Sequence, residues 1–286
     1  MDITMFCQRI AELAPILPKK LQVKDSARVI TQGTAFGDLH QDCEIGADQI
    51  LGQFLYEFFL EFENVRYLEI EGLSGFSRNQ GKWAVYVDPL DGSLNFKTAR
   101  ESGSCGLPYT VCVTILEVKT PLASKFEHIV GAVVIDLRNE DIWVAYKEAD
   151  EFHTFFNGKP AKTRPETKVG IGKMIVFGEM YYPSNRERLC RMFPEEKGWL
   201  RNPGSAAYEM ASVANGMAVA FICDQQKLHE LGAGYALVRG AGGVAVGFFS
   251  GTYFIGDESY VFNSQRPVIL AANKWIARDL WQRLAR

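Results

Sequence analysis

The sequence has no surplus of basic residues: 31 lysines and arginines stand against 34 aspartates and glutamates, and the net charge is −3. Proteins that bind nucleic acid polymers usually carry a basic patch, so this balance argues against such a partner. No apolar run approaches the length that crosses a bilayer, which argues against a membrane partner. The chain begins Met1-Asp2-Ile3-Thr4, without the basic and apolar regions of a secretory signal, and we therefore predict a cytoplasmic location.

The six cysteines are scattered and include no Cys-x-x-Cys pair. Such pairs are typical of zinc and redox sites, and disulfides belong to oxidising compartments, so free thiols are expected. Internal repeats, low-complexity tracts and an obvious linker are also missing from the sequence. With 47% hydrophobic and 23% charged residues over 286 positions, the composition is ordinary for one large domain or for two lobes that share a core.

Hydrophobic periodicity predicts alternating helices and strands. Helices are predicted at about 3–17, 48–62, 205–215, 230–239 and 275–286, and a capping box at 184–187 opens another. Strands are predicted at 83–87, 109–116, 129–136, 141–146, 173–177 and 219–223. This alternation implies a layered α/β or α+β architecture. Polarity rises between 146 and 173, which predicts a boundary between two lobes, 1–150 and 151–286.

The most informative segment is the strand-like run from Trp83 to Val87, which is followed by Asp88-Pro89-Leu90-Asp91-Gly92-Ser93. Two carboxylates three residues apart on a tight turn repel each other unless a cation lies between them. A divalent cation with oxygen ligands suits such a pair. The alternative is an ordinary Asp-Pro or Asp-Gly turn without a metal. Because the pattern extends over all fourteen residues from Trp83 to Phe96, we favour the metal site.

A second group of small and charged residues lies nearer the C-terminus. It comprises Gly204-Ser205-Ala206-Ala207, Asn215-Gly216, His229-Glu230-Leu231-Gly232-Ala233-Gly234 and Arg239-Gly240-Ala241-Gly242-Gly243. The small residues at 204–207 allow a ligand to approach the backbone closely. Tight helix packing would use the same residues, so both interpretations stay open.

These two segments resemble the signatures of the inositol monophosphatase family, the magnesium-dependent phosphomonoesterases that include fructose-bisphosphatases and 3′-phosphoadenosine phosphatases. With a weaker match near the N-terminus, the resemblance covers most of the chain. It implies an α+β or α/β sandwich of alternating helix and sheet layers with the active site between two lobes. The α+β lobe at 1–150 would then hold most metal ligands, and the α/β lobe at 151–286 would hold substrate contacts and one metal carboxylate. The resemblance also implies two or three Mg²⁺ ions and a homodimer.

The resemblance assigns roles within Asp88 to Ser93, the segment at the end of the predicted strand, which we call the strand-end segment. Asp88 and Asp91 would bind the metal ions together with the carbonyl group of Leu90. Ser93 would help to orient the nucleophilic water, and Gly92 would allow the backbone to approach a phosphate. The amides of Gly92 and Ser93 also open toward a predicted helix start, which is a natural anion site.

Two upstream acidic positions complete the implied set. The family's glutamate ligand matches Glu71, although Glu69 lies on the same face of the predicted strand. An earlier aspartate at a helix start matches Asp48, which precedes Glu71 by 23 residues, as in the family. Asp48 and Glu71 would act on the water, and Glu71 would also bind metal. Asp42 and Glu44 are rivals for the place of Asp48, whose carboxylate would equally suit the helix dipole.

The C-terminal segment departs from the family pattern. Glu230 stands where the family has a metal-binding aspartate, and since Mg²⁺ tolerates geometric error poorly, the second metal site is either rebuilt around Glu230 or weakened. His229 replaces a tryptophan. It is a possible ligand, but a surface position beside the site is favoured, because Mg²⁺ prefers oxygen ligands. Gly240 replaces a usual glutamate, which is expected to affect packing rather than chemistry.

The implied substrate contacts come from two places. Gly204, Ser205 and Ala206 would approach the substrate, together with Gly92 and Ser93. Asp224 would also contact it, although Cys223 replaces the acidic residue of inositol-preferring members and weakens the case for inositol phosphate. Arg201 and Lys227 are further candidates for phosphate or substrate contacts.

The leading hypothesis is a phosphomonoesterase that hydrolyses an inositol phosphate, a sugar phosphate or bisphosphate, or a nucleotide 3′-phosphate by metal-activated attack of water. The alternative is a catalytically weak or inactive relative that binds a phosphorylated ligand or partner. The departures at His229 and Glu230 and the weak match around Glu71 motivate this alternative. The complete segment from Asp88 to Ser93 favours the enzyme.

Overall fold

The computed structural model describes residues 1–22, 26–34, 41–103, 106–118, 125–166, 168, 174–178, 180, 183–193, 200–223, 226–249, 252–255 and 268–284. For residues 29–34, 41–44, 183–185, 248–249, 252–255 and 284 it describes the backbone alone. Within these ranges, every helix is too short or too polar to cross a membrane.

The larger of two main sheets has eight strands in the order β10-β9-β8-β7-β6-β5-β3-β4. The bounds are β3 Val65–Ile70, β4 Leu73–Ser77, β5 Trp83–Asp91, β6 Thr110–Glu117, β7 Ile129–Asp136, β8 Ile142–Glu148, β9 Glu151–Phe156 and β10 Lys159–Pro160. Neighbouring strands are antiparallel, except that β3 and β5 run parallel. The strands predicted at 83–87, 109–116, 129–136 and 141–146 correspond to β5 to β8, so this part of the prediction is confirmed.

The smaller sheet is mixed and has the order β12-β11-β13-β16-β14-β15. The bounds are β11 Val176–Gly178, β12 Leu200–Arg201, β13 Ala220–Cys223, β14 Val244–Phe249, β15 Thr252–Ile255 and β16 Val268–Ala271. A separate hairpin pairs β1 (Val29–Thr34) with β2 (Gln41–Ile45). Its last residue leads directly into the helix that carries Asp48.

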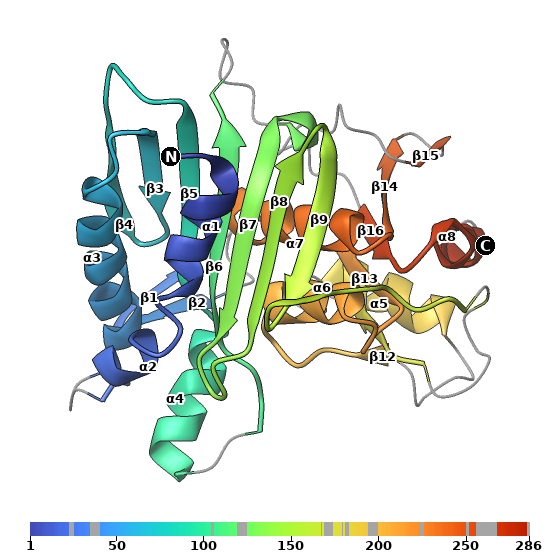
Figure 1. Ribbon diagram of the computed structural model, residues 1–286. Helices are drawn as coiled ribbons and strands as arrows, with labels where there is room; N and C mark the ends of the chain where they lie inside the picture. The colour runs from blue at the N-terminus through green and yellow to red at the C-terminus, as the bar shows by residue number, and fades with distance from the viewer. Residues whose placement is uncertain are drawn as a thin grey trace.

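Helices and sheets alternate in layers (Figure 1). The helices are α1 Ile3–Ala11, α2 Leu17–Lys20, α3 Gly46–Leu60, α4 Ser93–Ser102, α5 Pro183–Met192, α6 Ala206–Ala214, α7 Leu228–Gly240 and α8 Lys274–Leu284, with a 3₁₀ turn at Phe126–His128. Side chains of α1 and α3 share one core with the larger sheet, α6 and α7 lie between the two sheets, and α5 and α8 pack on the far face of the smaller sheet. The predicted layered sandwich is confirmed. The division at residue 150 stays a prediction.

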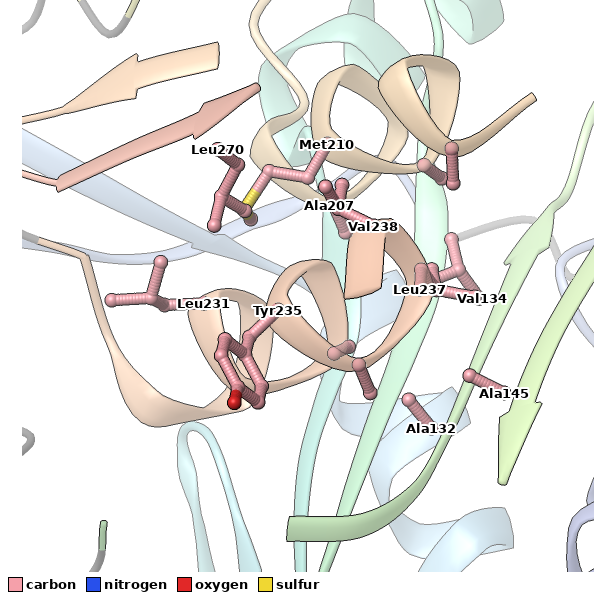
Figure 2. Close-up of a cluster of buried hydrophobic side chains, with 14 of the residues drawn as sticks. Ala132, Val134, Ala145, Ala207, Met210, Leu231, Tyr235, Leu237, Val238 and Leu270 are labelled. Carbon is pink, nitrogen blue, oxygen red and sulfur yellow. The ribbon is translucent and has the colours of Figure 1, made fainter. Parts of the chain in front are cut away.

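The central helix α7 is buried on almost every side. Figure 2 shows Leu231, Tyr235 and Val238 of α7 among side chains of α6, the larger sheet and the smaller sheet. A helix buried all round carries no polar face, and this explains its run of small and apolar residues. At Gly240 a Cβ atom would lie 2.3 Å from Thr154 Oγ1 on β9, so the glutamate expected from the resemblance would not fit.

The first predicted helix is wrong in length. The pattern predicted one helix over 3–17, but α1 ends at Ala11, turns follow, and α2 begins at Leu17. Pro15 lies inside the predicted helix, where it has no N–H to donate and its ring clashes with the preceding turn. The apolar spacing continues through this break because Leu13, Ala14 and Leu17 are still buried in the same core.

Candidate active site

The end of β5 presents both aspartates of the strand-end segment. All nine residues of β5 are buried, and the pairing with β6 shifts between Asp88, opposite Cys112, and Asp91, opposite Thr110. Pro89 lies in this irregularity, where a residue without an N–H costs no ladder hydrogen bond. The two carboxylates therefore leave the strand in different environments.

Three carboxylates from distant parts of the chain form an acidic cluster. Oxygens of Glu71, Asp88 and Glu230 lie within 4.8 Å of one another. Glu71 follows β3 in a turn fixed by its N–H, which donates to Val87 O at 2.9 Å. Glu230 belongs to the first turn of α7. The sequence prediction named all three residues, and the fold brings them together.

Burial and mutual repulsion make the acidic cluster electrostatically costly. Burial raises the pKa of both Asp88 and Glu230 well above the usual range, and the charge of Glu71 raises each pKa further. Glu230 Oε2 is buried and has no hydrogen-bond partner among the described residues. A hard divalent cation with oxygen ligands would satisfy this orphaned oxygen and offset the repulsion, so the donor set fits Mg²⁺.

Asp91 differs from the acidic cluster because its oxygens are already satisfied. Oδ2 accepts hydrogen bonds from Ser205 Oγ at 2.6 Å, Ala207 N at 2.8 Å and Thr110 Oγ1 at 3.2 Å, and Oδ1 accepts one from Ala206 N at 3.1 Å. Asp91 thus accepts the free amides at the start of α6. It joins the larger sheet to the helix layer between the sheets.

Asp48 and Ser93 form a hydrogen-bonded pair near Leu90. Ser93 Oγ lies 3.0 Å from Asp48 Oδ1 and 2.9 Å from Leu90 O, while Asp48 Oδ2 accepts from Ile45 N at 2.8 Å. Asp48 lies in the first turn of α3, as its sequence position predicted. Burial raises the pKa of Asp48 to about 7, and its hydrogen bonds only partly oppose that rise. A carboxyl group with this pKa can take up or release a proton near neutral pH.

The turn between Asp91 and α4 depends on a glycine. Gly92 has φ of +91°, and a Cβ there would lie 2.8 Å from Pro108 O and 3.2 Å from Ser205 Cβ. A residue with a side chain would be strained and would separate the two elements. Ser93 then opens α4, so the helix start predicted at Gly92 and Ser93 is confirmed.

Lys227 lies against the acidic cluster. It is the residue before α7, and its Nζ donates to Glu71 Oε1. Glu69, the rival of Glu71, lies outside the cluster and accepts from Tyr67 Oη at 2.7 Å. Among the rivals of Asp48, the side chains of Asp42 and Glu44 lie outside the described part of the structure.

The expected position of His229 was wrong. It was expected at the surface, but it is 7% exposed, and its ring packs against Tyr86 with centroids 6.0 Å apart. The preference for oxygen at the metal says nothing about burial, and α7 points this residue toward β5 and β6. Burial lowers the pKa of His229 to about 4, so the ring is neutral at pH 7.

The predicted substrate contacts lie near the Asp91 side of the site. Gly204, Ser205 and Ala206 precede or open α6, but the Ser205 hydroxyl and the Ala206 amide donate to Asp91. Asp224 lies outside the described residues. Arg201 is exposed, and its Nη1 donates to Leu200 O. Nothing in these contacts tests a substrate role.

Sequence reasoning missed two residues that hold the site in shape. Thr110 donates to Asp91 from the opposite strand, and Asn95 Nδ2 donates to Pro108 O at 2.7 Å and Pro203 O at 2.8 Å. Asn95 was visible two residues after Ser93, which opens α4, but its partners lie in other loops, and Pro203 is 108 positions away. Thr110 could be found only from the register of β5 and β6.

Comparison with known proteins identifies the family of this chain. A sequence model described as "Inositol monophosphatase family" matches residues 19–285. The chain belongs to the inositol monophosphatase family. A curated relative from Aquifex aeolicus (strain VF5), "Fructose-1,6-bisphosphatase/inositol-1-monophosphatase", is 27% identical over 205 residues, which cover 69% of this chain and 68% of the relative. The family identified from the sequence is therefore confirmed.

Solved structures show the same fold. The extragenic suppressor protein suhB from Bartonella henselae superposes with a TM-score of 0.75 at 20% identity and covers 100% of this chain and 99% of its own. An IMPase from Thermotoga maritima gives a TM-score of 0.67 at 18% identity over 97% of this chain and 95% of its own. An IMPase/NADP phosphatase, solved with Mg²⁺ and phosphate, gives 0.67 at 15% identity over 98% and 93%.

Proposed function

We propose that this member of the inositol monophosphatase family is a Mg²⁺-dependent phosphomonoesterase that hydrolyses a small phosphorylated polyol, sugar or nucleotide. The observation that carries the proposal is the acidic cluster of Glu71, Asp88 and Glu230 beside the Asp48–Ser93 pair. A cluster of three carboxylates, two of them buried and one with an orphaned oxygen, suits a divalent cation, and the adjoining pair can exchange a proton. Together these features suit hydrolysis by an activated water.

The acidic cluster and the carbonyl group of Leu90 would hold the metal. When bound, divalent ions increase the acidity of water and neutralise charge on the leaving oxygen. Ser93 Oγ, held between Asp48 and Leu90 O, is suited to orient a water, and Asp48 is suited to accept its proton, because its pKa is about 7. The amides at the start of α4 are suited to bind phosphate oxygens.

The contacts of Asp91 narrow its role. Its oxygens accept hydrogen bonds from Ser205, Ala206 and Ala207, so we propose that it mainly shapes the site, and that any metal bond it makes adds to these contacts. Gly204 to Ala206 would then meet the substrate through close backbone approach. Two or three Mg²⁺ ions, contact of Asp224 with the substrate and a homodimer remain predictions of the family resemblance.

The test is release of inorganic phosphate from a panel of inositol, sugar and 3′-nucleotide phosphates, with MgCl₂ and with EDTA. The variants are Asp88→Asn and Glu230→Gln, which remove one charge each from the acidic cluster. Asp150→Asn is the matched control, because Asp150 is 98% exposed on the β8–β9 turn. We expect Mg²⁺-dependent release that falls by about 100-fold or more in the cluster variants and is unchanged in the control.

A second function has one observation in its favour. The Lys227 ammonium already neutralises part of the acidic cluster, as suits a relative that binds a phosphorylated ligand without turnover. Absence of release from every compound at all Mg²⁺ concentrations, with a folded protein whose Tm rises with one of the ligands, would replace the enzyme by this binding function. The best substrate in the panel would otherwise identify the subfamily.

A further inference from the structure

Lys227 connects two distant segments at the acidic cluster. Its Nζ donates to Glu71, which lies 156 positions earlier in the chain, and the two side chains are 29% and 27% exposed. The backbone of Lys227 is extended immediately before α7, and Glu230 lies three residues further on in the first turn. This spacing places the lysine and Glu230 at the same end of one rigid helix.

The ammonium of Lys227 acts on the whole acidic cluster. Besides its bond to Glu71, its charge lowers the pKa of both Asp88 and Glu230 against the effect of burial. Oxygens of Glu71, Asp88 and Glu230 lie within 4.8 Å of one another, so an ammonium bonded to Glu71 lies beside the whole acidic cluster. The ammonium lies next to Glu71 Oε1, where a divalent cation bound to Glu71 would also lie.

We propose that Lys227 is a tethered counter-ion that competes with a divalent metal ion for Glu71, so that metal binding requires the Lys227 ammonium to leave the acidic cluster. The inference rests on the proposed function, because it assumes that the cluster is the metal site. It explains how three carboxylates, two of them buried, are accommodated in a folded protein without metal. It also predicts that this chain binds its metal more weakly than the same cluster would without the lysine.

The competition has a definite electrostatic basis. Each ionised carboxylate of the acidic cluster adds one negative charge, and the Lys227 ammonium offsets one of these charges. An incoming ion therefore meets a less negative site and must break the bond between Lys227 and Glu71. Both side chains are partly exposed, so water can solvate the released ammonium, and the competition costs affinity without abolishing binding.

The test measures metal binding directly. Mn²⁺ is titrated into metal-free protein and followed by electron paramagnetic resonance of the free ion and by calorimetry. We expect Lys227→Met to bind Mn²⁺ about tenfold more tightly than the wild type, and Lys227→Arg, which keeps the charge, to stay near the wild type. Lys147→Met is the matched control, because Lys147 is 24% exposed and pairs with Asp150 in the β8–β9 hairpin.

A second measurement uses stability. Loss of the tethered charge should lower the Tm of metal-free Lys227→Met by roughly 4 °C, and saturating MgCl₂ should restore it. Lys227→Gln, which can still donate to Glu71, serves if the methionine variant does not fold. Unchanged or weaker Mn²⁺ affinity in the folded neutral variants would overturn the counter-ion proposal while leaving the phosphatase proposal intact. No Mn²⁺ binding by any variant would overturn both.

Discussion

Asp88 and Asp91 lie three residues apart on one strand and are almost equally buried, at 6% and 9% exposure, yet their surroundings are opposite in kind. Asp91 accepts four hydrogen bonds from Thr110 and the start of α6. For Asp88 the described contact is one bond, from Leu90 N at 2.8 Å, and its other neighbours include the carboxylates of Glu71 and Glu230. The hydrogen bonds of the protein satisfy Asp91, whereas Asp88 lies among carboxylates that could hold a metal ion.

The difference predicts a structural role for Asp91 and a role in metal binding for Asp88. Hydrogen bonds to Asp91 fix where α6 begins, so its loss should damage the fold before it damages the reaction. The acidic cluster stores repulsion that a bound cation would relieve, so its carboxylates should cost stability in the absence of metal. Activity lost at Asp91 is therefore weak evidence for a metal ligand, whereas activity lost at Asp88 is strong evidence.

The largest predicted effect tests whether burial of the Asp48 carboxylate, beside the acidic cluster, lowers the stability of the fold. The pKa of Asp48 is raised from 3.8 to about 7, so the folded protein holds this proton more tightly than the unfolded chain. The free energy of unfolding of metal-free protein should then fall between pH 4 and pH 8, by roughly 4 kcal/mol from this group. Asp48→Asn should remove that part of the fall, as measured by urea unfolding in EDTA across this range.

Asparagine suits this test because it can keep the local hydrogen bonds. Its carbonyl oxygen can accept from Ile45 N, and its amide can donate to Ser93 Oγ, which still donates to Leu90 O. Asp150→Asn is the control and should leave the pH slope unchanged. A wild-type protein whose stability rises over this range, or an Asp48→Asn variant with the wild-type slope, would show that burial of Asp48 has no such cost.

The next prediction compares the two aspartates by the same substitution. Asp91→Ala should lower the free energy of unfolding by about 3 kcal/mol, because Ser205, Thr110 and two amides of α6 lose their acceptor. Asp88→Ala should leave metal-free stability within about 1 kcal/mol of the wild type, since the loss of the bond from Leu90 N is offset by relief of repulsion. Urea unfolding at pH 8 in EDTA measures both.

Saturating MgCl₂ supplies the control for this pair. The wild type should gain stability from the ion, and Asp88→Ala should gain much less. Equal losses for the two alanine variants without metal would mean that both carboxylates are structural, and the comparison would fail. A larger loss for Asp88 would reverse it.

The sequence was sufficient to predict the main strands and the candidate site residues, but not the contacts that distinguish Asp88 from Asp91. The strands β5 to β8 were predictable because continuous apolar runs mark buried strands. The segment from Asp88 to Ser93 indicated the candidate site through its resemblance to the family signature. The cluster partners Glu71 and Glu230 were matched from spacing to the family. The different fates of Asp88 and Asp91 were not predictable, because they depend on the register of β6 and on the position of α6, which are contacts between distant segments. The bond between Lys227 and Glu71 is also a contact between distant segments, and the sequence marked Lys227 only as a candidate phosphate or substrate contact.

The smallest predicted effect concerns His229, and it tests whether groups other than carboxylates lack hydrogen-bond partners beside the site. Neither ring nitrogen of buried His229 has a hydrogen-bond partner among the described residues, and the distance from Nε2 to Glu69 Oε1 is 3.6 Å. His229→Phe keeps a ring against Tyr86 and removes both buried polar atoms, so it should raise the free energy of unfolding by about 1 kcal/mol. His153→Phe, at an exposed position on β9, is the control and should change it by less than about 0.5 kcal/mol. The measurement is urea unfolding at pH 7. A loss of stability in His229→Phe would mean that the ring nitrogens have hydrogen-bond partners in solution, and the unsatisfied polar groups beside the site would then be the carboxylates of the acidic cluster.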